Sequence, residues 1–516
     1  MIEEREKTKH SGRFTIEPGR EIYGELTLDG PKSSLYVWDK DFFNPRGKNN
    51  GFVKGILHNL TKVSLIDCIT SKDPGSFSNT EESHHFARLF PHYAILGDQH
   101  ISPAEDTIAE VHFVIDDATT LFHDLEAFGR VSNARSIIEK VVQHDVEQLE
   151  HDREIKIGAH PEIVYFTGKS EIFSADTELG KISAYHNPST TFLSSPEGVK
   201  ITNKIFAKLE FADPITLEDV IDRTYRVLHF FGLLVGRPQN LVELWILKKV
   251  DQKRTADLRV YWSHCPKYER IKGRWDPHHF DVLINPIRDP EIFSYILTKW
   301  LDREWPVQAK NWYSARVRFF KNFEKQEYYD IDRLIGAANM FDILPPEAVS
   351  GKFEISEDLK SARDKCRQIF KRLPGSPDRN SVLSALGRIG KSTLKKKVRH
   401  RAQFLIDKVG DKIPDFFTIT DEAVDCRNYY VHGSPPSSRI DYNQYPGPLH
   451  FLTNTLEFVF AASDLVEAGW DIKKWCKSQS RTSHPFGHYL YTYLSEKESV
   501  FSSSKIAQSS DEKTSS

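Results

Sequence analysis

The chain of 516 residues has few cysteines and no long apolar run. Its five cysteines are odd in number and far apart, which fits reduced thiols better than a disulfide framework or a zinc cluster. We find no stretch of about 18 apolar residues, the length a helix needs to span a membrane. The charged start, Met1 to Lys7, lacks the apolar core of a signal peptide. These absences predict a cytoplasmic protein with no membrane partner.

The sequence also lacks a strong overall charge and a recognisable metal motif. A formal net charge of -3 with 28% charged residues gives no general argument for binding nucleic acid, so any such argument has to be local. The histidines at 84 and 85, at 264 beside Cys265, and at 278 and 279 match no standard zinc spacing. We therefore expect no metal and no cofactor.

Apolar and polar residues alternate through much of the first half of the chain, which is typical of antiparallel strands. One helix is predicted at 217–235, opened by Asp213-Pro214-Ile215-Thr216 and ended by Gly236. The pattern predicts a β-rich first domain at 1–285. The predicted strands are 21–28, 63–69, 108–115, 163–166, 204–211, 241–247 and 258–262.

From about Asp289 the apolar residues recur at helical spacing instead. This predicts an up-and-down helical bundle at 286–480, so the fold class is α+β multidomain, a β-rich region followed by an all-α bundle. Residues 499–516, rich in Ser and Lys, are expected to be a disordered tail. The predicted helices are 319–340, 353–373, 382–406, 416–432 and 449–468.

The most informative motif is Arg427-Asn428-Tyr429-Tyr430-Val431-His432. Gly433 follows it, and prolines stand two and three residues further on, so the motif is predicted to close a helix. His432 would lie in the last turn, where the helix dipole favours a protonated imidazole. Asn428 and His432 are four residues apart and share a helix face.

The spacing of arginine and histidine is weak evidence by itself, because the chain contains it six more times. Only Arg427 is followed by an asparagine. It is also the only one of the seven arginines whose histidine is predicted to lie at a glycine-capped helix end. The other pairs are Arg5/His10, Arg153/His160, Arg223/His229, Arg259/His264, Arg274/His279 and Arg481/His488.

Arg427, Asn428 and His432 resemble the signature of the HEPN ribonucleases: an arginine, a polar residue, a short spacer and a histidine at the end of a helix. The layout, β-rich and then helical, is similar to that of ApeA-type anti-phage HEPN proteins. The resemblance implies a sensing or regulatory N-terminal region and a HEPN homodimer in which two motif helices face each other. It also implies metal-independent cleavage of RNA, host RNA such as tRNA, after a phage-derived trigger.

Metal-free RNA cleavage uses the neighbouring 2′-hydroxyl as nucleophile, so a protein must move a proton and stabilise a phosphorane. His432 suits the first task, and the planar guanidinium of Arg427 suits the second. Asn428 could orient the phosphate or the histidine. One subunit supplies a single histidine, whereas cleavage needs a base and an acid, and a two-fold dimer would supply both.

Two other interpretations of the motif stay open. Arg427 could pair with Asp421 or Asp425 on the helix surface while His432 only caps the helix end. Alternatively, the domain could be a non-catalytic RNA- or ligand-binding module that dimerises but does not cut.

A local basic segment precedes the motif. Residues 352–412 contain 17 Lys/Arg and 7 Asp/Glu. Its densest part could follow a phosphate backbone, although a solvated helix face is the alternative interpretation. The candidate RNA-binding residues are Lys395, Lys396, Lys397, Arg399 and Arg401.

Overall fold

The structure is a computed structural model in which contacts divide the chain into two compact units. The β-rich unit comprises Met1–Tyr225, Gln239–Lys267 and Asn285–Ser294, and the helical unit comprises Arg226–Pro238, Tyr268–Ile284 and Tyr295–Ser516. Two segments that precede 285 thus belong to the helical unit, whereas the sequence predicts a single boundary there. The structure describes residues 7–17, 19–44, 51–71, 75–78, 82–149, 156–192, 199–249, 255–270, 276–304, 310–349, 356–390, 393–435, 439–442, 447–478 and 482–511.

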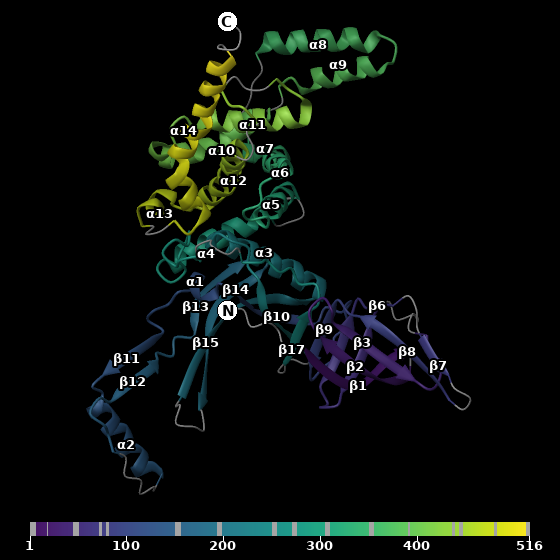
Figure 1. The fold of residues 1–516 in the computed structure, drawn as a ribbon, viewed down its shortest axis with the longest axis vertical. Coiled ribbons are helices and arrows are strands. Elements are labelled where there is room, and N and C mark those ends of the chain that lie inside the picture. The colour runs from purple at the N-terminus through teal and green to yellow at the C-terminus, as the bar shows by residue number, and fades with distance from the viewer. Residues whose placement is uncertain are drawn as a thin grey trace. The chain divides into compact units, whose positions relative to one another are not determined.

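The β-rich unit is built on one sheet of 15 strands, to which most of its strands belong (Figure 1). Neighbouring strands pair antiparallel, in the order β13-β14-β15-β10-β16-β17-β9-β5-β4-β1-β2-β3-β8-β6, and β7 adds to β8. A separate two-stranded sheet joins β11 and β12. The strands are β1 (Thr8–Glu17), β2 (Arg20–Leu28), β3 (Ser34–Asp39), β4 (Val53–Leu57), β5 (Lys62–Ile66), β6 (Ile69–Thr70), β7 (Gly75–Ser78), β8 (Ser83–Phe90), β9 (Tyr93–Gly97), β10 (Ile108–Ile115), β11 (Phe128–Ser132), β12 (Glu162–Phe166), β13 (Glu171–Thr177), β14 (Gly180–Phe192), β15 (Val199–Ile215), β16 (Leu241–Lys249) and β17 (Thr255–Trp262).

A continuous apolar core lies under the strands β1 to β5, β8 and β9. The alternation along β1 explains it, because Phe14 and Ile16 are buried while Arg13 points outward. Gly55 on β4 faces Phe14, and a Cβ there would come within 2.5 Å of the ring, so only glycine lets the two strands approach.

The predicted β-rich character is confirmed, and the helix α3 (Leu217–Val235) has the predicted bounds. Thr216 caps it by accepting from the Asp219 backbone N–H, at 3.2 Å. The predicted strand 63–69 is instead split into β5 and β6, because Asp67 adopts a left-handed φ of 54°. The sequence also misses α1 (Ala118–Leu121) and α2 (Arg135–Leu149). The apolar residues of α2 are largely exposed, so no buried face marks it.

The helical unit confirms the predicted all-α C-terminal region. Its 3₁₀ turn η2 (Gly410–Lys412) joins α10 to α11. The helices that follow the sheet are α4 (Pro290–Asp302), α5 (Lys310–Phe323), α6 (Ile331–Ile343), α7 (Pro346–Val349), α8 (Glu357–Arg372), α9 (Pro377–Arg388), α10 (Leu394–Val409), α11 (Phe416–His432), α12 (Gly447–Ala468), α13 (Ile472–Ser478) and α14 (Pro485–Asp511).

Helix α12 is the centre of this unit, because it packs against α5, α6, α10, α11 and α14. It is apolar nearly all round, as a helix surrounded by others must be. Its buried Asp464 accepts from Arg316 Nε at 2.8 Å and from Arg303 Nη1 at 2.6 Å. Arg316 also forms an ion pair with Glu304, with 3.1 Å between Nη1 and Oε1. This buried ionic cluster ties α12 to the helices before it.

Two predicted helices are wrong in their length. The segment 319–340 is broken between α5 and α6, where Gln326 has a φ of 49° and Asp330 caps the new helix by accepting from the Arg333 N–H at 2.6 Å. The segment 382–406 is broken before Thr393, whose hydroxyl caps α10. Such caps stop one helix and start the next although the apolar period continues.

The helix α14 continues to Asp511, into the tail for which the sequence predicts disorder. Its first half docks on α12, and extending an existing helix costs far less than starting one, so a polar sequence can follow. Residues 512–516 of the predicted tail lie outside the described residues.

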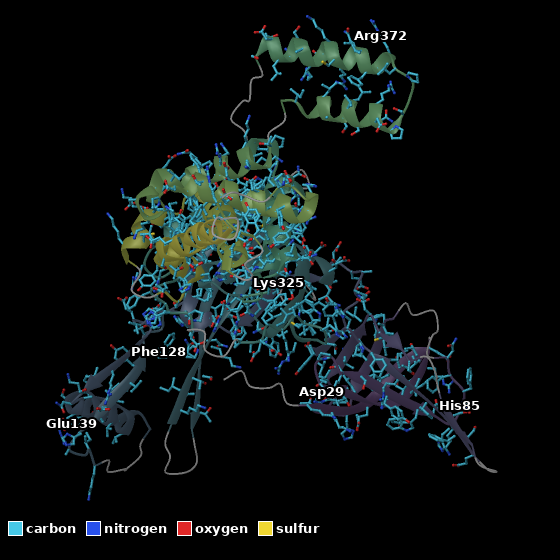
Figure 2. All side chains as sticks on the ribbon, turned by 45° about the horizontal axis from the view of Figure 1, so that its top comes forward. Asp29, His85, Phe128, Glu139, Lys325 and Arg372 are labelled. Atoms are coloured by element: carbon cyan, nitrogen blue, oxygen red, sulfur yellow. The ribbon has the colours of Figure 1, made fainter. Side chains whose placement is uncertain are left out.

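The helix α8 packs on α9 and buries none of its own side chains. Arg372, its last residue, stands among exposed side chains (Figure 2). None of the described helices has the length and apolar composition needed to cross a membrane.

Candidate active site

Helix α11 carries the motif and ends as the sequence predicts. Gly433 adopts a left-handed φ of 63°, and its N–H donates to the Tyr429 carbonyl at 3.1 Å. One face of the helix is buried against α6, α10 and α12, with Ile419 and Ala423 inaccessible to solvent. The last turn is left on the surface, where His432 is exposed.

The guanidinium of Arg427 contacts the other two residues of the motif, Asn428 and His432. Its Nη1 donates to Asn428 Oδ1 at 3.1 Å and to His432 Nε2 at 3.0 Å. Its Nη2 donates to Oδ1 of Asn339 on α6, at 3.1 Å. The structure therefore brings all three predicted residues of the motif together, and it does so through the arginine.

The partners of the guanidinium are two amides and an imidazole, and none of them is a carboxylate. Among the described residues no carboxylate lies within ion-pair distance of Arg427. Asp425 is held by Lys395 at 2.7 Å, and Asp421 accepts from Arg399 Nε at 2.9 Å. The alternative in which Arg427 pairs with one of these two aspartates is therefore wrong.

The contact with Arg427 sets the role of one ring nitrogen of His432. A guanidinium can only donate, so Nε2 of His432 is the acceptor in this contact. The protonated imidazole that the helix dipole favours stays a prediction.

Asn339 is a residue of the site that sequence reasoning misses. It lies 88 positions before Arg427, on a helix whose apolar period gives no hint of the contact. The half-buried amide approaches the guanidinium because α6 packs directly on α11. Only the tertiary fold reveals this partner.

Tyrosines secure the helix end that carries the site. Tyr430 donates to the Tyr442 carbonyl at 2.6 Å, and Tyr442 donates to Glu422 Oε2 at 2.9 Å. The ring of Tyr429 packs edge-on against Tyr430, with centroids 5.1 Å apart. These contacts hold the segment after α11 against the helix and restrict the position of His432.

The predicted RNA-binding residues lie on α10, and one of them is assigned wrongly. Arg401 is only 1% exposed and donates to Glu467 at 2.7 Å and to Ser463 at 2.9 Å, so it stabilises the core and cannot meet RNA. Lys397 is held by Asp342 at 3.2 Å. Lys395 and Arg399 pair with Asp425 and Asp421 on α11, and Lys396 is exposed. Much of the local positive charge is thus balanced within the unit.

The cysteines are free thiols at every position. Burial raises the pKa of Cys68 and of Cys426 to about 12, so neither thiol is a ready nucleophile. The described part of the chain contains no group of three or more His, Cys, Asp or Glu side chains placed to hold a metal ion.

The helical bundle, the arginine and the histidine together define a HEPN-type domain. In the chain this domain follows the β-rich region. Comparison with known families gives the same result: residues 5–300 match the ApeA N-terminal domain 1, and residues 308–474 match the Apea-like HEPN domain. The chain belongs to the ApeA-like family of HEPN proteins. This membership supports a role as an anti-phage HEPN protein. No curated protein and no solved structure matched the chain.

Proposed function

We propose that the chain is a metal-independent endoribonuclease that cleaves RNA during phage infection. The observation that carries the proposal is the guanidinium of Arg427, whose Nη1 lies 3.0 Å from His432 Nε2 at an exposed helix end and whose described partners include no carboxylate. A cation without a counter-ion beside a histidine whose Nε2 accepts is the pair that transesterification of RNA requires.

In the proposed reaction the 2′-oxygen attacks the adjacent phosphorus, and the bond from phosphorus to the 5′-oxygen breaks. His432 Nε2 accepts the proton of the 2′-hydroxyl, and Arg427 faces the negative oxygens of the phosphorane. When Arg427 turns toward the phosphate it stops donating to His432, so substrate binding frees the base. Asn428 and Asn339 hold the arginine in place from two helices. The products are a 2′,3′-cyclic phosphate and a 5′-hydroxyl.

The leaving 5′-oxygen needs a proton, and His432 of one chain is already used as the base. We propose that a second copy of the chain supplies a second His432 across a two-fold axis, which acts as the acid. The partners in this account are therefore RNA and another subunit. Host RNA such as tRNA as substrate, a phage-derived trigger and a cytoplasmic location complete the proposal, on the basis of family resemblance.

The test compares wild-type, His432→Ala and Arg427→Ala proteins on total cellular RNA in EDTA, with and without phage lysate. His144→Ala is the matched control, because it removes an exposed helical histidine outside the motif. We expect cleavage to fall roughly 100- to 10,000-fold in His432→Ala and roughly 100- to 1000-fold in Arg427→Ala, on the order of what loss of an acid-base group or a phosphate clamp costs. The control should cut as wild type does.

Unchanged cleavage by His432→Ala, or a need for added divalent metal, would contradict the proposal. RNA that is bound tightly and never cut, with or without lysate, would favour the non-catalytic binding module instead. Mixing wild-type chains with an excess of His432→Ala chains tests the dimer, because a mixed dimer keeps only one of the two histidines, so we expect the excess to suppress wild-type cleavage.

A further inference from the structure

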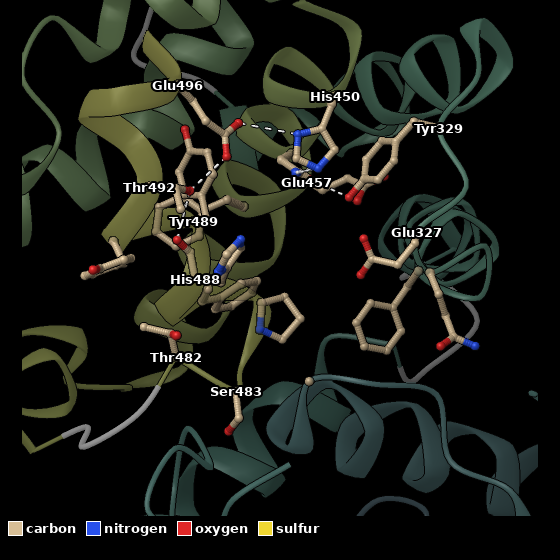
Figure 3. Close-up of a pocket in the computed structure, with 18 of the residues that line it drawn as sticks. Glu327, Tyr329, His450, Glu457, Thr482, Ser483, His488, Tyr489, Thr492 and Glu496 are labelled. Carbon is tan, nitrogen blue, oxygen red and sulfur yellow. Dashed lines mark hydrogen bonds and ion pairs between the residues drawn. The ribbon is translucent and has the colours of Figure 1, made fainter. Parts of the chain in front are cut away.

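The helical unit contains a cavity of about 310 Å³ that the proposed ribonuclease chemistry does not use (Figure 3). Its walls come from the α5–α6 connection, from α12 and from the first half of α14. In Figure 3, His450 and Glu496 lie at one end of the cavity, and Tyr329 and Glu327 lie on the wall opposite Tyr489 and Thr492. This volume is at the lower end of the range typical of small-molecule sites.

Among the described residues that line the cavity, Arg333 is the only permanent cation, and most of its N–H groups are used within the protein. Its Nε and Nη2 donate to the two carboxylate oxygens of Glu457, both at 2.8 Å. Its Nη1 donates to the carbonyls of Gln326 and Tyr328, at 2.5 and 2.9 Å. Four of the five N–H groups of a guanidinium are thereby used. A phosphate or carboxylate entering the cavity would find little from Arg333 to bind it.

A histidine of the wall is also held by hydrogen bonds. Tyr329 donates to Asn454 Oδ1 at 2.6 Å, which turns the Asn454 NH₂ group toward His450 Nε2, at 3.1 Å. Because that nitrogen accepts, Nδ1 of His450 is the atom that faces Glu496 Oε2, at 3.4 Å. His450 therefore orients the Glu496 carboxylate.

Carboxylates therefore make the net charge of the described cavity wall negative. Burial opposes ionisation of Glu496, but hydrogen bonds from His450 and Thr492 prevail and hold its pKa below the usual value. Glu327 and Glu457 line the same space. Among the described residues that line the cavity, three carboxylates against one guanidinium leave a formal excess of two negative charges, with the histidines counted as neutral.

Aromatic rings form much of the remaining wall. Phe319, Phe323, Phe458, Phe486 and Tyr489 all line the cavity. Ring faces attract cations and pack well against flat apolar groups. We propose that this cavity binds a small organic cation: a flat apolar body that lies among the rings and a protonated amine that meets Glu496. The proposal does not rest on the ribonuclease assignment.

A matched set of probes tests the charge requirement on the full chain. Tryptamine, tryptophol and indole-3-acetate share one ring system and carry a positive, a neutral and a negative side chain at pH 7. Isothermal titration should give tryptamine a dissociation constant at least tenfold lower than that of tryptophol, with indole-3-acetate the weakest.

Glu496→Gln keeps the shape of the side chain and removes its charge, so it should abolish the tenfold preference for tryptamine over tryptophol. Glu498→Gln, an exposed residue on the same helix outside the cavity, is the matched control and should keep the preference. Glu327→Gln on the opposite wall provides a second variant if Glu496→Gln does not fold, and it should weaken tryptamine more than tryptophol. Equal binding of the three probes, preference for the anion, no binding of tryptamine, or full preference in the folded Glu496→Gln or Glu327→Gln protein would each overturn the proposal.

Discussion

Replacing Asn339 with alanine should slow RNA cleavage without unfolding the protein. The change removes one of the three hydrogen bonds that hold Arg427, the one that comes from another helix, at 3.1 Å. A hydrogen bond to a charged group contributes about 1.5–3 kcal/mol. If that energy is lost from the transition state, kcat/KM falls roughly 10- to 150-fold, at about 1.4 kcal/mol for each factor of ten. Asn339 is half-buried and lies outside the main core, so the melting temperature should change little.

A second substitution separates positioning from simple packing. Asn339→Asp keeps an acceptor of the same size but places a carboxylate beside Arg427, which would then be neutralised like Arg399 beside Asp421. We expect KM for RNA to rise more than kcat falls, because a paired arginine attracts phosphate less.

Fluorescent oligonucleotides would give kcat and KM for the Asn339 variants, and thermal melts would report their folding. Asp342→Asn is the matched control, since Asp342 lies on the same helix but pairs with Lys397 instead. The reasoning fails if Asn339→Ala cleaves within twofold of wild type, or if Asn339→Asp binds RNA as tightly as the parent.

Three further predictions concern stability and the basic helix. Arg316→Met should leave Asp464 and Glu304 buried without their cation, so urea unfolding should show a loss of about 3–5 kcal/mol, partly recovered by adding Asp464→Leu. Burial lowers the pKa of His229 to about 4, whereas the unfolded residue titrates near pH 6.5. The unfolded state therefore binds more protons below pH 6.5, and stability should fall by about 2 kcal/mol from pH 7 to pH 5, a loss that His229→Phe should largely remove. Arg401→Met should lower the melting temperature more than Arg399→Met, and equal melting temperatures would contradict the buried role of Arg401.

The parts of the fold that depend on local signals could be predicted from the sequence. Helices α3 and α11 have the expected bounds because a threonine cap opens the first and glycines end both. The seven strand segments predicted from alternation all fall on strands, but they cover only eight of the seventeen strands described, and β1 and β14 are among those missed. The helix breaks near Gln326 and Thr393 were not predicted either, because an apolar period continues across them while a cap and a left-handed residue interrupt the backbone.

The site likewise has a part that the sequence predicts and a part that only the fold reveals. Arg427, Asn428 and His432 are close in the chain, so their meeting follows from helix geometry once the helix end is known. The role of Asn339 depends on a contact between two helices that forms only in the folded domain. Arg401 was misassigned because a run of basic residues does not show which side of the helix faces the core. In the structure Arg401 lies on the buried face of α10, together with Val398, Ala402 and Leu405.

The central claim is that Arg427 and His432 cleave RNA through the 2′-hydroxyl, and the chemistry of the new ends tests it most directly. RNA incubated with wild-type protein in EDTA, under activating conditions, should acquire 3′ ends that carry 2′,3′-cyclic phosphates. The same mapping with His432→Ala should show none above background. New ends with a 3′-hydroxyl, or cyclic phosphates formed equally by His432→Ala, would contradict the account.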